Sequence, residues 1–276
     1  MGTSDWRQAP LAEVVTGGHL SCSLEAAALV LARQEYPSLD PAPWLARLDA
    51  MAALARPMLS EQADPAEIIG VVNDVLFRDL QFRGNTRHYL DPRNSFLNDV
   101  LERRTGIPIS LCVLYAAVAR RVGLELHGTG FPGHFLLVHT RPGWPVVIDA
   151  FGRGQVLAQQ DCERLLERQG RPWDERVLAP VSPLAVLRRM LENLQNIYLE
   201  RQDWPRLLRT SAQIAVVHPD EADLHFIQGV ALAALGSGVE AIAALERFLT
   251  RKPGAPNRDH VLDLLSELRR AADAPE

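Results

Sequence analysis

Three side chains near the middle of the sequence have types and an order that could support thiol chemistry. Cys112 lies in the segment GIPISLCVLYAAVARRVGL (residues 106–124), and His134 and Asp149 follow it. A cysteine nucleophile needs a histidine within hydrogen-bonding reach as a base, and an Asp or Asn that orients the second ring nitrogen. The thiolate is favoured where the cysteine lies at a helix N-terminus. These three residues therefore suggest the hypothesis of a cysteine-type catalytic site.

The histidine and the aspartate are expected on two neighbouring strands. Segments 134–140 and 144–150 are rich in β-branched and apolar residues, and a turn at Arg141-Pro142-Gly143 separates them. The midpoint between His134 and Asp149 falls in this turn, so an antiparallel pair would place them opposite each other, with Cβ atoms about 5 Å apart. A structural interpretation stays open, in which Asp149 accepts N–H bonds from the following turn and His134 is an ordinary interface histidine.

The expected helix offers two candidate nucleophiles, Cys112 and Ser110, and neither is a strong one. Cys112 lies in SLCVLYAAVA, the most apolar part of the segment, where a buried cysteine behaves as a small hydrophobe and burial raises its pKa. Ser110 is nearer to the helix start and is interpreted as a first-turn cap, because a serine nucleophile would need strong activation by a base.

The sequence predicts neither a metal site nor a cofactor. His134 and His139 are an odd number of residues apart and so point to opposite faces of one strand, which argues against a site that both share with Asp149. The three cysteines are widely spaced and form no C-x-x-C pair, so neither a structural zinc site nor a disulfide framework is expected. Reduced thiols are typical of the cytoplasm.

The composition and charge of the chain argue against several classes of protein. The 276 residues are 47% hydrophobic and 23% charged, which is typical of a globular protein. The net charge of −5 argues against nucleic-acid binding through phosphate contacts. The start, MGTSDWRQAPLAEVV, lacks the features of a signal peptide, and no apolar run approaches the roughly 18 residues of a membrane span. We therefore expect a cytoplasmic protein that binds neither nucleic acid nor membrane.

Helix-start residues organise the first third of the chain. Ser23, Asp40-Pro41 and Asp64-Pro65 each precede a run with helical apolar spacing, and each offers an oxygen that can cap the helix. Three short segments at 125–131, 134–140 and 144–150 predict a small antiparallel sheet, and LAPVSP at 178–183 predicts a linker.

The last third is helical and repeats. Pro219 and Pro253 are 34 residues apart and each ends a pair of expected helices, which matches the period of a tetratricopeptide repeat. Small residues such as Gly229 and Ala241 would let the paired helices approach closely, and residues 259–272 predict a capping helix. We therefore expect an α+β chain with one domain at residues 1–180 and helical repeats at 181–276.

Residues 106–151 resemble the core of the transglutaminase-like (papain-like) superfamily. Gly106, Gly123-Leu124, Gly133-His134 and the segment VVIDAFGRG fall at the positions of that family's helix, histidine strand and aspartate strand. The resemblance implies a Gly-x-Cys start for the helix, and with Gly106 as the glycine the nucleophile position falls on Pro108. Together with LDPRNSFLNDVLERRTGIPISL and the repeats, residues 20–270 resemble the bacterial transglutaminase-like, tetratricopeptide-containing (invasion-regulator-like) family.

Three functions are compatible with these residues. The first is a non-catalytic transglutaminase-like protein that binds a protein or peptide partner through its groove and repeat tail and acts as a regulator. The second is a cysteine hydrolase or acyltransferase that uses Cys112 with His134 and Asp149. In the third, the His134–Asp149 pair only braces the sheet of a scaffolding protein. We expect the first.

Overall fold

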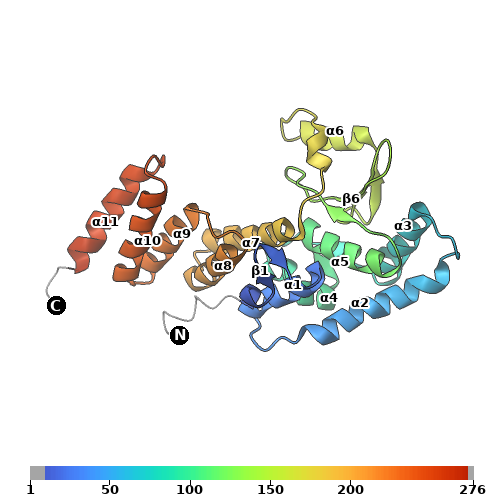
Figure 1. The fold of residues 1–276 in the computed structure, drawn as a ribbon, viewed down its shortest axis with the longest axis horizontal. Coiled ribbons are helices and arrows are strands. Elements are labelled where there is room, and N and C mark those ends of the chain that lie inside the picture. Colours follow the sequence, from blue (N-terminus) through green and yellow to red (C-terminus); the bar gives the residue numbers. More distant parts are fainter. Residues whose placement is uncertain (1–9, 273–276) are drawn as a thin grey trace. The chain divides into compact units, whose positions relative to one another are not determined.

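The computed structural model describes residues 10–272 and divides them into two compact units (Figure 1). One unit comprises residues 18–190, and the other comprises residues 191–272 together with 10–17. The division falls inside helix α7 (Pro183–Glu200). This division into compact units does not test the predicted domain boundary between residues 180 and 181, which stays a prediction. No helix within the described range is both long enough and apolar enough to span a membrane.

The first half of the larger unit is helical, as the cap residues predict. Ser23, Asp40 and Asp64 each accept a hydrogen bond from a backbone N–H in the first turn of the helix that follows. The α-helices there are α1 (Leu24–Leu31), α2 (Pro41–Ala55), α3 (Pro65–Asn73), α4 (Leu97–Arg103) and α5 (Pro108–Arg121), and a π-helical turn at Asp74–Asp79 continues α3.

Helix α5 is the central element of this unit. It packs against α1, α2, α3 and α4, and almost all of its residues as far as Ala119 are buried. At its C-terminal end, Arg120 and Arg121 both pair with the buried carboxylate of Glu25 on α1. Two short parallel strands, β3 (Arg83–Gly84) and β4 (Thr105–Gly106), bring the chain to the start of α5.

A four-stranded antiparallel sheet follows α5, in the order β5-β6-β7-β8. Its strands are β5 (His127–Gly128), β6 (Leu137–His139), β7 (Val146–Asp149) and β8 (Gln155–Leu157). The three predicted strands exist but are shorter than predicted, and β8 was missed because QVL follows a glycine-rich turn and offers no alternation. One face of the sheet packs on α6 (Gln159–Glu167) through a cluster that includes Leu136, Val147 and Cys162.

The smaller unit contains the repeats. Helices α8 (Trp204–Val217), α9 (Asp223–Ala234), α10 (Gly238–Arg251) and α11 (Arg258–Ala272) follow α7, and Figure 1 shows α9, α10 and α11 as neighbours. Gly229 on α9 lies against Leu245 on α10, and a Cβ atom at Gly229 would approach the Leu245 side chain to 2.6 Å. The small residue therefore permits the close helix pairing that the repeat pattern predicts. Helix α11 covers Leu245 and Phe248 through Val261 and Leu265, as expected of a capping helix.

Candidate functional site

Helix α5 begins at Pro108, the residue that the sequence predicts at the nucleophile position of a thiol enzyme. Pro108 is the first residue of the helix, it is buried, and the extended backbone of Ile107 precedes it. A proline at this position loses no hydrogen bond, since the first N–H groups of a helix have no partner inside it. Gly106 lies so close behind that a Cβ atom there would be 2.7 Å from Ser110 Oγ. The helix start is thus tightly packed, and proline offers it no nucleophilic atom.

Ser110 acts as a cap, as its position predicts. Its hydroxyl accepts a hydrogen bond from the N–H of Ile107 at 3.0 Å and donates to the carbonyl of Asn94 at 2.6 Å. The side chain is fully buried. Because the proton of the hydroxyl is committed to a backbone carbonyl, Ser110 joins α5 to the loop before α4.

Cys112 lies below the helix start and is also fully buried. Its Sγ donates to the carbonyl oxygen of Phe135 at 3.4 Å. Burial raises the pKa of the Cys112 thiol far above its ordinary value, the negative charge of Asp149 raises it further, and the N–H of Ala150 opposes the shift only in part. The sulfur therefore lies near the histidine and aspartate segments, but in its protonated form.

His134 and Asp149 lie together. His134 Nε2 is 3.0 Å from Asp149 Oδ1, and each side chain is 16% exposed. The predicted register is wrong, however: β6 pairs with β7 through Leu137 opposite Ile148 and His139 opposite Val146, so His134 is not directly opposite Asp149. His134 instead lies in the turn before β6, where Gly133 adopts a left-handed backbone (φ 63°), and its ring reaches back to Asp149.

Asp149 serves both the histidine and its own turn. Its Oδ1 accepts the N–H of Gly152 at 2.9 Å. Burial by itself would raise the pKa of Asp149, but the hydrogen bond and charge of His134, and the N–H groups of Gly152 and Phe151, together lower it below its ordinary value. Asp149 therefore has both expected roles: it accepts an N–H bond from the following turn, and it pairs with His134. The imidazole nitrogen left for other partners is Nδ1.

Residues that the sequence did not single out hold this turn in place. Asn73, at the end of α3, donates through Nδ2 to the carbonyl of Gly154 at 3.0 Å and accepts from the Tyr115 hydroxyl at 3.0 Å. Tyr115 lies on α5, so a single asparagine connects α5, α3 and the turn that carries Asp149. Asn73 continues an ordinary helical pattern in the sequence, and the glycines of FGRG were the only indication that this turn is closely packed.

The ring of Phe151 lies beside the pair, and that of Tyr89 lies beside Phe151. The ring of Phe151 is 6.3 Å from that of His134 and 6.4 Å from that of Tyr89, both in edge-to-face geometry. Gly84 on β3 leaves room for the Phe151 ring, which a Cβ atom at that position would overlap. The loop from Asn85 to Asn94 therefore borders the histidine site.

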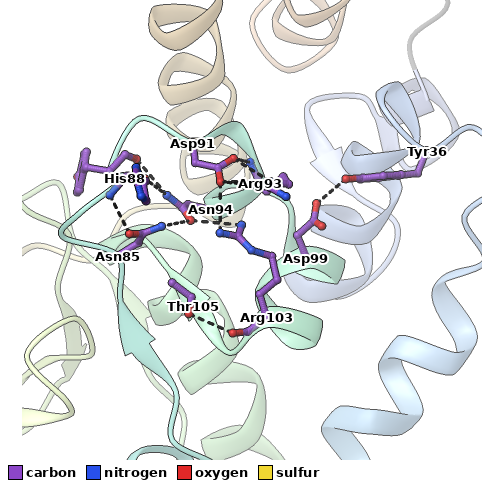
Figure 2. A network of polar contacts seen from close by, with 10 residues as sticks. Tyr36, Asn85, His88, Asp91, Arg93, Asn94, Asp99, Arg103 and Thr105 are labelled. Atoms are coloured by element: carbon purple, nitrogen blue, oxygen red, sulfur yellow. Dashed lines mark hydrogen bonds and ion pairs between the residues drawn. The ribbon is translucent and has the colours of Figure 1, made fainter.

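A polar network centred on Asn94 fixes that loop (Figure 2). Asn94 is fully buried and donates through Nδ2 to the carbonyls of His88 at 2.8 Å and Tyr89 at 3.1 Å. Its Oδ1 accepts from Asn85 Nδ2 at 3.0 Å, and Arg103 Nη2 binds Asp91 at 3.3 Å. The segment LDPRNS carries part of the family resemblance. This network gives a structural reason for its polar residues.

Across residues 10–272, no group of three or more His, Cys, Asp or Glu side chains converges in a way that could hold a metal ion. His139 does not join the pair, because its Nδ1 contacts the carbonyl of Glu125 at 3.1 Å. His134 and Asp149 are thus paired, and the nearby thiol of Cys112 has a raised pKa.

Comparisons with known proteins agree with this architecture. The model of the Transglutaminase-like superfamily matches residues 42–192, and that of the tetratricopeptide repeat matches residues 194–268. A UPF0162 protein of Xylella fastidiosa is 36% identical over 257 residues, covering 88% of this chain and 90% of that protein. The UPF0162 protein YchA of Escherichia coli is 25% identical over 256 residues, 91% of this chain and 90% of that protein.

A eukaryotic protein shares part of the chain. F-box only protein 21 of Homo sapiens is 33% identical over 183 residues, which is 62% of this chain but 28% of that protein. No solved structure matches the chain significantly. The assignment of Pro108 to the nucleophile position stays a prediction. Since the superfamily model covers more than half of the sequence and the bacterial relatives align along most of it, this chain belongs to the transglutaminase-like superfamily and carries tetratricopeptide repeats after that domain.

Proposed function

We propose that this protein binds a protein or peptide partner through its transglutaminase-like domain and its repeats, acts as a regulator, and does not catalyse a reaction by covalent thiol chemistry. One observation carries the second half of the proposal. Cys112, which lies near Asp149, is fully buried, donates a hydrogen bond to the carbonyl of Phe135, and has a strongly raised pKa. A protonated, enclosed thiol is a poor nucleophile.

The repeats support the binding half. Stacked helix pairs create extended surfaces that bind other proteins. At the turn between α9 and α10 two large apolar side chains are exposed, Leu235 at 41% and Val239 at 79%. An exposed apolar patch marks an interaction site, and we propose that these two side chains belong to one.

The binding half is tested by pull-down with the full chain. Leu235→Asp combined with Val239→Asp should abolish capture of a partner, while circular dichroism stays unchanged. Leu54→Asp is the matched control, because Leu54 is an equally apolar residue that is 55% exposed on α2, outside the repeats. Partner capture that survives the double substitution, or that the control abolishes equally, would contradict a role for the repeat surface.

The alternative function is a cysteine hydrolase or acyltransferase, favoured by the 3.0 Å contact between His134 and Asp149. It is tested with p-nitrophenyl acetate as an acyl donor. We expect no burst of p-nitrophenol and the same slow hydrolysis for Cys112→Ala as for the natural chain. A burst that disappears in both Cys112→Ala and His134→Ala would establish the enzyme instead.

A further inference from the structure

A short segment from the start of the described chain occupies the surface of helix α8. The 3₁₀ turn Pro10–Glu13 belongs to the same compact unit as residues 191–272 and packs against α8. Leu11 in this turn is fully buried. Because a turn of four residues cannot enclose a leucine side chain by itself, the elements against which it packs supply the cover. The repeat unit therefore holds a leucine, and that leucine comes from the chain itself.

Gln213 on α8 holds this segment by its backbone. Its Oε1 accepts the N–H of Leu11 at 3.0 Å, and its side chain is fully buried. The donor end of the same amide is not used, because Gln213 Nε2 has no hydrogen-bond partner among residues 10–272. A buried donor without a partner costs free energy, and such groups are uncommon in folded proteins. The segment thus satisfies only one end of the amide that binds it.

The conformation of the segment accounts for the missing bond. The carbonyl of Leu11 accepts the N–H of Val14 at 3.0 Å, which closes the turn. In an extended chain, by contrast, the N–H and the C=O of one residue point to the same side and can both pair with one partner, as in an antiparallel sheet. A glutamine amide offers the matching acceptor and donor. An extended leucine residue would therefore satisfy Gln213 at both ends.

We propose that the surface of α8 around Gln213 binds an extended, leucine-containing peptide of a partner protein, and that Pro10–Glu13 occupies this site as an internal competitor. The leucine of the partner would take the place of Leu11, and its N–H and C=O would pair with Oε1 and Nε2 of Gln213. This inference rests on the proposed binding function and names the chemistry of the partner.

The unused donor selects a partner rather than a second copy of this chain. The internal segment is tethered, so its effective concentration at the site is high, and a competitor must make a contact that the segment lacks. The hydrogen bond to Gln213 Nε2 is such a contact. A second copy would present the same turn at Leu11 and would leave the same donor without a partner. An extended peptide gains this bond and loses none of those that Gln213 already makes.

The experiment follows the fluorescence anisotropy of a labelled peptide during titration with the full chain. The peptide is PLAEVVT, residues 10–16, acetylated and amidated at its ends. A chain with Leu11→Asp lacks the internal competitor and should bind this peptide with a dissociation constant on the order of 100 μM. The natural chain should bind at least about tenfold more weakly, because its site is mostly occupied. Leu54→Asp adds the same charge at an exposed position of α2 and should behave like the natural chain.

Two further changes test the contacts of the amide, both with the Leu11→Asp chain. Adding Gln213→Met keeps the approximate size of the side chain but removes its amide, and the peptide should bind about tenfold more weakly. An N-methyl group on the leucine of the peptide removes the same N–H contact without altering the protein, and should weaken binding by a similar factor. The peptide with Ala12→Pro should bind about threefold more tightly, because proline holds the preceding leucine in the extended region.

Equal binding of the peptide by the natural and the Leu11→Asp chains, or no binding by either, would overturn the proposal. An affinity that is unchanged by N-methylation would overturn the role of Gln213, and a proline peptide that binds no more tightly would overturn the extended conformation. The proposed function fails separately, since its pull-down depends on Leu235 and Val239 and its ester assay on Cys112. A partner retained through the repeats, with no peptide bound by the Leu11→Asp chain, would remove only this inference.

Discussion

The two halves of the candidate site differ in how accessible their polar side chains are. On the sheet side, His134 and Asp149 are 3.0 Å apart and partly accessible. On the helix side, the start of α5 presents Pro108, and the thiol of Cys112 is buried and protonated. On the sheet side, Asp149 also accepts the N–H of Gly152 in its own turn, which holds its carboxylate in place. The position of Asp149 beside His134 is thus also accounted for by local structure.

The largest expected effect concerns the helix half, through Asn94. Asn94→Ala removes the acceptor and donors of a fully buried amide and leaves the carbonyls of His88 and Tyr89 without their partner. We expect the free energy of unfolding to fall by about 2–4 kcal/mol in urea titrations. Asn85→Ala is the matched control, because Asn85 is only partly buried, and it should cost about 1 kcal/mol. Equal losses would mean that the network is not centred on Asn94.

The sheet half should respond to Asp149→Asn in a pH-dependent way. The pKa of Asp149 is lowered in the folded protein, so ionised Asp149 stabilises the fold above the unfolded pKa of about 3.9, and this stabilisation is lost as the pH falls through the folded pKa. At pH 7 the substitution should lower the free energy of unfolding by about 1–2 kcal/mol. The difference should shrink as the pH is lowered from 5 to 3. A difference that does not change over this range would show that the charge of Asp149 contributes nothing.

The hydrogen bond that connects the two halves, from Tyr115 to Asn73, should contribute less to the free energy of unfolding than Asn94 or Asp149 does. Tyr115→Phe removes the hydroxyl that donates to Asn73, which in turn holds Gly154 in the turn after Asp149. We expect a loss of about 1 kcal/mol in unfolding free energy. The NMR signals of Gly152 and Gly154 should shift although both lie on a different element from Tyr115. If those signals stay in place, Asn73 holds the turn without help from α5.

The smallest effect is expected for Cys112→Ala. The thiol is buried and makes one long hydrogen bond to the Phe135 carbonyl, so its removal should cost about 1 kcal/mol or less in unfolding free energy. Partner capture should be unchanged. Loss of capture by a stably folded Cys112→Ala chain would bring this residue back into the functional site.

Much of the fold follows from local patterns in the sequence. The caps at Ser23, Asp40 and Asp64 act within one turn of their helices, so their effect can be predicted without knowledge of the tertiary fold. The repeat period and Gly229 likewise predict a helix pair that the structure contains. The family resemblance proved correct for the same reason, since its motifs are contiguous segments.

The site could be predicted only in part, because its details depend on long-range packing. The pairing of His134 with Asp149 was expected, but from a wrong register: the turn at Pro132-Gly133 directs the ring to its partner rather than a strand. Asn73 and Tyr115 meet 42 residues apart in the chain, and neither belongs to a local motif.

The central claim is that the thiol near the histidine–aspartate pair is not ionised in the folded protein. The most direct measurement is the rate of iodoacetamide labelling at each cysteine from pH 6 to pH 10, followed by peptide mass spectrometry. The partly exposed Cys22 should react, whereas Cys112 should react at least tenfold more slowly at every pH and become reactive only in urea. Labelling of Cys112 that reaches half its maximum near pH 7, and that slows in His134→Ala, would contradict the account.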